Sequence, residues 1–158
     1  MAAFLQLPYT SKRSHDLAEL FTIRDARIRD MSLIDSYASA EGMDRIPGPR
    51  GVRVAVNADD EVVGFCRLQA DANGISYVNP IVTYGLWRGY GVGRALIEDA
   101  HARVGELRLI SRGTSEGFYR KLGFVEMPWE DVDLEAASED CDNCPYRDAC
   151  GPVPMRLA

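Results

Sequence analysis

The sequence contains no uninterrupted apolar run that approaches the roughly 20 residues a helix needs to cross a bilayer. Its first thirty residues mix charged residues with short apolar runs such as AFLQL, so we expect no signal-peptide core. These absences disfavour a membrane association and predict a cytoplasmic protein. The length of 158 residues, with 46% hydrophobic and 27% charged, is typical of one globular domain, which we expect to span residues 1–158.

Positive charge is also scarce, since 18 Lys and Arg residues stand against 24 Asp and Glu residues and the net charge is -6. Most of the negative excess lies in residues 130–142, which contain seven carboxylates and no Lys or Arg, so the net charge becomes +1 when they are left out. A nearly neutral body lacks the basic excess that binds nucleic-acid phosphates, and we expect no nucleic-acid partner. The acidic run itself is typical of a solvated loop.

Hydrophobic periodicity and turn residues predict a mixed order of strands and helices. Pro80 interrupts the run ISYVNPIVT, which predicts a bulge or discontinuity in that strand. The expected elements are a strand at 3–7, one or two helices that fill 15–43, strands at 52–56, 62–68 and 75–83, a helix over 91–104, a strand at 107–111, a short helix over 115–123, and strands at 124–127 and 153–157. This order indicates an α/β or α+β fold with a mixed sheet.

The stretch RGYGVGR at 88–94 places three glycines between a predicted strand and a predicted helix. Such a turn exposes unpaired N–H groups at the positive end of the helix dipole, an arrangement that binds phosphate. A Walker loop would need a Lys after the glycines, and the dinucleotide fingerprint would need a third Gly where Leu96 stands. Neither motif fits, and a simple tight turn is the alternative.

The spacing Arg88-x-x-Gly91-x-Gly93 resembles the acyl-CoA-binding loop of the GNAT N-acetyltransferase superfamily, and FYRKLGF at 118–124 resembles its second signature. The resemblance covers most of the chain and implies a mixed, mostly antiparallel sheet with splayed central strands, flanked by helices. It implies acetyl-CoA as co-substrate. The residues that it assigns to the pantetheine arm and pyrophosphate are Ile81, Val82, Thr83, Arg88, Gly89, Tyr90, Gly91, Val92, Gly93 and Arg94.

Acyl transfer from a thioester to an amine needs a neutral amine, a stabilised oxyanion and a proton for the leaving thiolate. Tyr119 is the candidate acid, because a phenol of pKa ~10 is protonated at neutral pH and close in acidity to an alkyl thiol. The alternative is a tyrosine that only packs against the sheet. The resemblance suggests a backbone N–H near Val82 for the oxyanion. The base is unassigned, since Asp71 in the sequence DANG is more typical of a turn.

Three of the four cysteines lie in CDNCPYRDAC, within an acidic segment at 130–151 that we expect to be an insertion before the last strand. Cys141, Cys144 and Cys150 can supply three thiolates to a structural zinc ion. Their spacing also resembles part of the iron–sulfur motif of RecB-type nucleases, and unligated or redox-active thiols are a third alternative. Cys66 is predicted to be a core residue. A fourth metal ligand would come from Cys66, Asp140, Asp142, His15 or His101.

The resemblance therefore implies an N-acetyltransferase that moves an acetyl group from acetyl-CoA to an amine of a small molecule or a protein, by direct attack in a ternary complex. The helices within 15–43 and the segment 130–151 are expected to frame the acceptor pocket. A homodimer is compatible with the family. The competing interpretation is a regulatory module that binds acyl-CoA with little turnover, while its cysteine segment senses metal or redox state.

Overall fold

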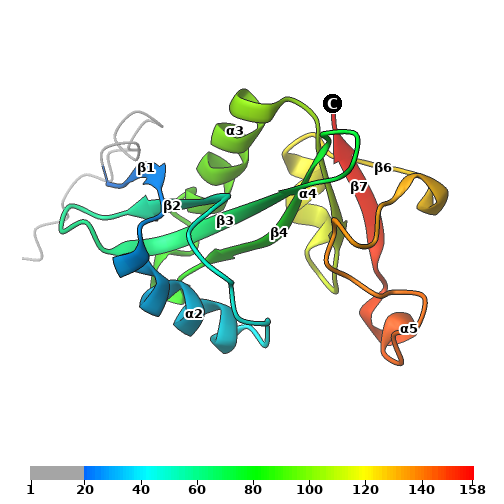
Figure 1. Cartoon of the computed structure of the whole chain (residues 1–158), viewed down its shortest axis with the longest axis horizontal. Coiled ribbons are helices and arrows are strands. Elements are labelled where there is room, and N and C mark those ends of the chain that lie inside the picture. Colours follow the sequence, from blue (N-terminus) through cyan, green and yellow to red (C-terminus); the bar gives the residue numbers. More distant parts are fainter. Residues whose placement is uncertain (1–19) are drawn as a thin grey trace, which may run out of the picture.

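The computed structural model describes residues 20–158, which form a seven-stranded sheet covered by helices on both faces (Figure 1). The strand order is β1-β2-β3-β4-β5-β7-β6, and every neighbouring pair is antiparallel except β4 and β5. The strands are β1 (Thr22–Asp25), β2 (Val52–Val56), β3 (Val62–Ala70), β4 (Ser76–Thr83), β5 (Leu107–Ser111), β6 (Val125–Glu126) and β7 (Val153–Leu157). The expected mixed, mostly antiparallel sheet is confirmed.

Helices cover the two faces of the sheet because each carries an apolar stripe that must be buried. Helix α2 (Met31–Ala40) covers one face and packs Ile34 and Ala38 against the valines of β2. Helix α3 (Val92–Val104) covers the other face through Leu96, Ile97 and other apolar side chains, together with α4 (Glu116–Lys121). Side chains of β2 alternate between the two faces of the sheet and pack in both apolar layers, so the sheet forms the middle of a three-layer molecule.

The predicted hairpin at 52–68 is confirmed, and β2 pairs with β3 along its whole length. Gly64 of β3 lies directly beneath α3, where an added Cβ would come within 2.8 Å of Val92 Cγ1 and 3.0 Å of Val82 O. Glycine is therefore required for α3 to pack this close to the sheet.

The parallel strands β4 and β5 separate shortly after they meet, because Ser76 pairs with Leu107 and Tyr77 with Arg108 but no later pair follows among the described residues. On its other edge β4 shifts register against β3 between Cys66 and Leu68. This shift lies opposite Pro80 and confirms the predicted irregularity. The splayed central strands open a gap that Figure 1 shows between β4 and the C-terminal part of the sheet.

The prediction of helix throughout residues 15–43 is wrong for the described part before residue 31. Thr22–Asp25 is a strand, β1, whose residues pair with Val56 to Arg53 of β2. A 3-10 helix at Ile28–Asp30 then leads into α2. The apolar spacing of Phe21 and Ile28 resembles a helix, but pairing with the edge of β2 determines the local structure. The strand predicted at 3–7 lies outside the described residues.

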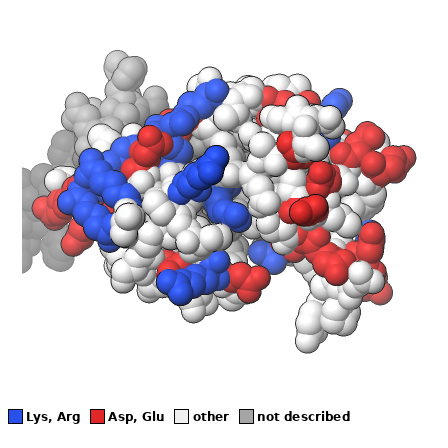
Figure 2. Space-filling model, in the orientation of Figure 1, with Lys and Arg blue, Asp and Glu red and all other residues white. Residues whose placement is uncertain are grey.

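The C-terminal segment between β6 and β7 is held to the sheet by specific contacts. Asp133 N–H donates to the hydroxyl of Tyr77 at 2.9 Å, and the amide of Asn79 donates to the Ala137 carbonyl. The segment contains a 3-10 helix at Trp129–Asp131 and the short helix α5 (Arg147–Cys150). In Figure 2 acidic side chains gather at the end of the molecule that this segment forms, which confirms that the negative charge is local.

None of the helices in residues 20–158 combines the length and the apolar character that a membrane crossing requires.

Candidate active site

A cavity of about 650 Å³ lies where the free end of β4 meets the N-terminus of α3. It collects most of the residues that the sequence predicts to bind the co-substrate. Those that line it are Ile81, Val82, Thr83, Arg88, Gly89, Gly91, Val92, Gly93 and Arg94. Tyr90 is not among them, because its exposed ring packs against Trp87 with the centroids 5.6 Å apart. We call this cavity the donor cleft.

The loop at the mouth of the donor cleft leaves its backbone donors free. Gly89 and Gly91 adopt φ values of +85° and +81°, which favour glycine, and Gly91 caps α3. Within the described chain, no N–H from residue 89 to 94 donates to another protein group. Six unpaired N–H groups thus surround the positive end of a 13-residue helix, which is the arrangement that binds a phosphate or pyrophosphate.

Charged side chains flank this anion site. Arg88 and Arg94 are both more than half exposed, so their guanidinium groups can reach a bound phosphate. Arg88 is ion-paired with Glu41, which follows α2, across the mouth of the cleft. Arg94 lies 3.8 Å from Glu98 on the next turn of α3.

The edge of β4 that lines the donor cleft has backbone groups to offer a ligand. Tyr84 N–H donates to Val63 O at 2.8 Å on the β3 side. Because backbone groups alternate between the two sides of a strand, those of Ile81 and Thr83 face away from β3, toward the cleft. No β5 residue pairs with this part of β4. An extended ligand can therefore align along it as an additional strand.

Tyr119 lies on α4 at the inner end of the donor cleft, and only 9% of the residue is exposed. Its ring packs between Phe118 and Phe124, with centroid distances of 5.1 and 5.5 Å. Burial raises the pKa of the phenol above its usual value, so the group stays protonated. Its hydroxyl makes no side-chain hydrogen bond within residues 20–158. Every buried side-chain N or O atom in these residues has a hydrogen-bond partner, so the Tyr119 hydroxyl is not fully buried and opens into the cavity.

A second cavity of about 90 Å³ continues beyond Tyr119 into the gap between β4 and β5. It shares Met43, Ile81, Ser115 and Tyr119 with the donor cleft, so the two cavities adjoin at these residues. We call it the inner cavity. The segments expected to frame an acceptor pocket do line it, through Met43 after α2 and through Ala137 and Glu139 of the C-terminal segment.

Arg112 and Glu139 are the charged residues of the inner cavity, and neither was predicted from the sequence to be a site residue. Arg112 directly follows β5, and its Nε lies 3.5 Å from Glu139 Oε1. Glu139 sits in the run of carboxylates that is typical of a solvated loop, so nothing in the sequence distinguishes it. For Arg112 the one available signal of a site residue was its place directly after a predicted strand, where loops often carry functional side chains.

Asp71, the nearest carboxylate that the sequence offered as a base, has the turn role instead. Its carboxylate accepts hydrogen bonds from Asn73 N–H at 2.8 Å and Ile75 N–H at 3.0 Å. It lines neither the donor cleft nor the inner cavity.

The three C-terminal cysteines line one pocket of about 440 Å³, bordered by Arg112 and Glu139. In residues 20–158, however, no three His, Cys, Asp or Glu side chains are arranged to hold a metal ion, and the structure as described does not fit one. Burial raises the pKa of the Cys141 thiol above its ordinary value. The metal site stays a prediction. His15 lies outside the described residues, and Cys66 is a core residue as expected, with a thiol pKa raised to about 12 by burial.

Comparison with known proteins identifies related sequences. A family model described as an acetyltransferase (GNAT) domain matches residues 50–126. An uncharacterized N-acetyltransferase of Chlorobaculum tepidum is 26% identical over 145 residues, which cover 84% of this chain and 93% of that protein. The peptidyl-lysine N-acetyltransferase YjaB of Escherichia coli is 37% identical over 83 residues, covering 51% of this chain and 53% of that protein.

A solved structure shares the fold. Rv2747 from Mycobacterium tuberculosis, determined in complex with CoA, superposes with a TM-score of 0.69 and covers 87% of this chain and 98% of its own. The two sequences are 18% identical, so this likeness concerns the fold alone.

Proposed function

Because the chain belongs to the GNAT acetyltransferase family, we propose that it transfers the acetyl group of acetyl-CoA to an amine by direct attack within a ternary complex. The observation that carries this proposal is the junction of the two cavities. The donor cleft has an anion site at one end and the Tyr119 phenol at the other, and the inner cavity begins at the same phenol. A family member that only senses acyl-CoA would have no need of the inner cavity.

The donor cleft binds acetyl-CoA by its backbone. The pyrophosphate lies on the free N–H groups between Gly89 and Arg94, with Arg88 and Arg94 as counter-charges. The pantetheine arm aligns along the free edge of β4 at residues 81–83. This arrangement places the thioester beside Tyr119, where the two cavities meet.

The chemistry then requires one proton to move to sulfur. The acceptor amine loses a proton to solvent before it reacts, and its neutral nitrogen then attacks the thioester carbonyl to form the C–N bond. A backbone N–H of Ile81 or Thr83 donates to the oxyanion. When the C–S bond breaks, the Tyr119 hydroxyl gives its proton to the thiolate, and the proton released by the amide nitrogen restores the phenol. The products are the N-acetyl amine and CoA.

Calorimetric titration with acetyl-CoA, followed by initial-rate kinetics, tests this function. We expect one acetyl-CoA per chain, and reciprocal plots that intersect when acetyl-CoA and an amine are varied together. Parallel lines would indicate a covalent acetyl-enzyme and contradict direct attack. Absence of acetyl-CoA binding would remove the donor cleft as the co-substrate site.

The acceptor is an amine of a small molecule or of a protein. The E. coli relative is named as a peptidyl-lysine N-acetyltransferase, and its alignment covers about half of each chain. The inner cavity is much smaller than the donor cleft, at about 90 Å³ against about 650 Å³, which favours a small acceptor over a bulky one.

A further inference from the structure

The inner cavity is lined by one positive and one negative side chain, Arg112 and Glu139. Arg112 is 46% exposed at the side chain and Glu139 21%. No other charged residue lines the cavity among the described residues. Its fixed charges therefore cancel, although the surface segment that carries Glu139 is strongly acidic.

The backbone holds Glu139 in this position. Asn79 of β4 donates to the carbonyl of Ala137, and Ser138 Oγ donates to Gln69 Oε1 of β3 at 2.8 Å. Ser138 itself has φ +54°, a left-handed conformation that costs a non-glycine residue about 1 kcal/mol or more. The sheet thus fixes the two residues before Glu139, and the carboxylate that follows projects to the cavity wall.

The ion pair between Arg112 and Glu139 is loose. The shortest distance between the two groups is 3.5 Å, and neither side chain makes a hydrogen bond anywhere in the described part of the chain. A guanidinium has five N–H donors and a carboxylate can accept several bonds, so both groups keep almost their full capacity for a ligand. An exposed pair of this kind contributes about 0–1 kcal/mol to stability, so a ligand group can replace either partner at little cost.

We propose that the acceptor is a small amine that also carries a carboxylate, of the amino-acid type, and that Arg112 binds its carboxylate while Glu139 binds its ammonium group before the proton is lost. The proposal rests on the proposed acetyltransferase function and names the substrate class of that same site. Arg112 is then a specificity-determining residue and Glu139 a binding residue.

Charge balance favours this class over a plain amine. An acceptor with only a positive charge would take Glu139 from Arg112 and would leave the guanidinium unpaired a few ångströms away, where like charges repel. A zwitterion replaces each partner by a group of the same sign, so both charges remain paired after the exchange. Bidentate recognition of a carboxylate is also the task for which the planar guanidinium is best suited.

A panel of acceptors tests the substrate class. Each of the twenty standard L-amino acids, its methyl ester, and a blocked peptide with one lysine is incubated with acetyl-CoA and enzyme, and the N-acetyl product is measured by mass spectrometry. We expect at least one free amino acid to be acetylated, with kcat/KM at least tenfold above that of its ester. Acetylation of the esters or of the peptide in preference to every free amino acid would overturn the proposal while leaving the acetyltransferase function intact.

Two variants separate recognition from folding. Arg112→Gln is expected to raise KM for the free amino acid at least tenfold but KM for its ester by less than twofold, because only the former offers a carboxylate. Glu139→Gln is expected to raise KM for both, since both keep the ammonium group. Equal effects of Arg112→Gln on acid and ester would contradict the proposal.

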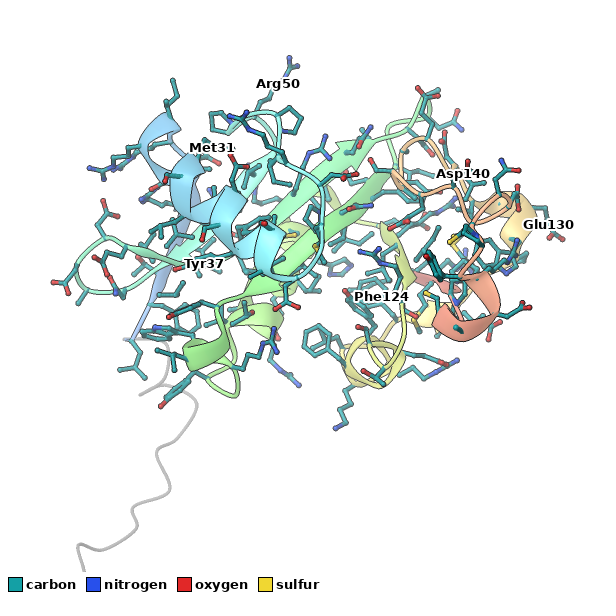
Figure 3. All side chains as sticks on the ribbon, turned by 90° about the horizontal axis from the view of Figure 1, so that it is seen from below. Met31, Tyr37, Arg50, Phe124, Glu130 and Asp140 are labelled. Carbon is teal, nitrogen blue, oxygen red and sulfur yellow. The ribbon has the colours of Figure 1, made fainter. Side chains whose placement is uncertain are left out.

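The matched controls are Arg50→Gln and Glu130→Gln, which remove the same charges at exposed positions that line neither the donor cleft nor the inner cavity. Figure 3 shows Arg50 well separated from Glu130 and Asp140. Both controls should keep KM within twofold of the wild type. Binding of acetyl-CoA without acetylation of any amine would overturn both the amino-acid acceptor and the acetyltransferase function. Acetylation of amines without a preference for a free carboxylate would overturn only the amino-acid acceptor.

Discussion

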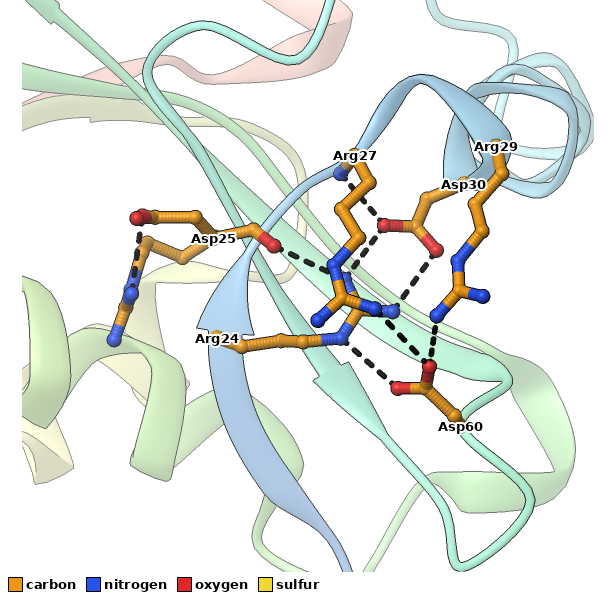
Figure 4. Close-up of polar contacts among 7 residues, drawn as sticks. Arg24, Asp25, Arg27, Arg29, Asp30 and Asp60 are labelled. Atoms are coloured by element: carbon orange, nitrogen blue, oxygen red, sulfur yellow. Dashed lines mark hydrogen bonds and ion pairs between the residues drawn. The ribbon is translucent and has the colours of Figure 1, made fainter.

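Two groups of charged residues on this protein differ in how completely their hydrogen-bonding capacity is used. At the N-terminal end of the sheet, Arg24 donates to both oxygens of Asp30, at 2.7 and 3.0 Å, and to Asp60 at 2.9 Å, while Arg27 and Arg29 also pair with Asp60 (Figure 4). We call these five residues the closed cluster. At the inner cavity, Arg112 and Glu139 approach no closer than 3.5 Å, and neither side chain makes a hydrogen bond within the described residues.

The difference indicates two roles for the same residue types. In the closed cluster, Arg24, Asp30 and Asp60 each make at least three hydrogen bonds and join β1, the start of α2 and the β2–β3 turn, so their partners are already present in the protein. Open charges at the inner cavity have donors and acceptors to spare, as does the hydroxyl of Tyr119 beside them. We therefore expect substitutions in the closed cluster to change stability, and substitutions around the cavities to change binding or turnover.

The largest expected effect is on turnover, at Tyr119. Tyr119→Phe removes the proton donor but keeps the ring that packs against Phe118 and Phe124, so kcat should fall about 100-fold, equivalent to about 2.7 kcal/mol on the barrier. Acetyl-CoA affinity by calorimetry should stay within twofold. A variant with wild-type kcat and a lower melting temperature would place Tyr119 with the purely structural residues.

The next largest effect concerns stability and compares the two groups directly. Asp30→Asn breaks a bidentate bond to Arg24 at a residue that is only 5% exposed, so the free energy of unfolding should fall by about 2 kcal/mol. Glu139→Gln should change it by less than about 0.5 kcal/mol, as expected of a surface substitution. Urea unfolding of both variants measures this contrast. Equal losses of stability would remove the distinction between closed and open charges.

A smaller effect is expected on co-substrate affinity. An added Cβ at Gly93 would lie 3.1 Å from Phe118 Cζ and 3.7 Å from Thr83 Oγ1, inside the donor cleft. Gly93→Val should therefore weaken acetyl-CoA binding about tenfold, or about 1.4 kcal/mol. Gly48→Val is the control, because an added Cβ at Gly48 meets nothing within 4 Å. Unchanged affinity in Gly93→Val would show that acetyl-CoA does not approach the loop backbone.

The smallest effect is a pH dependence of the closed cluster. The hydrogen bond from Arg24 lowers the pKa of Asp30 below its ordinary value, so the stabilisation is complete above the unfolded pKa of ~3.9 and is lost as the pH falls through the folded value. The difference in unfolding free energy between wild type and Asp30→Asn should thus be constant from pH 7 to about pH 5 and narrow below pH 4. A stability difference that widens on acidification would contradict a lowered pKa of Asp30 in the folded protein.

Much of the fold and the donor cleft could be predicted from local sequence. The hairpin at 52–68, the strand at 107–111 and the helix that begins after Gly91 each carry their own periodicity and turn residues, and a backbone-lined anion site leaves a glycine pattern in the sequence. Gly123, with φ +97°, ends α4 as its position after Leu122 predicts. These features depend on neighbours along the chain.

The inner cavity and β1 could not be predicted in this way, because contacts between distant residues determine them. Arg112 and Glu139 come together only when the C-terminal segment folds back on β3 and β4. Thr22–Asp25 is a strand because β2 offers an edge to pair with, not because of its own pattern. Single residues at such positions carry no spacing rule that distinguishes them from a solvated surface.

The most direct test of the account is to incubate the purified protein with acetyl-CoA labelled with ¹³C in the acetyl group and a mixture of free amino acids, and to measure CoA and labelled products together by mass spectrometry. The account predicts labelled N-acetyl amino acid in an amount equal to the CoA released, and a roughly 100-fold slower appearance of both with Tyr119→Phe. Release of CoA without an acetylated amine, or no release at all, would contradict it.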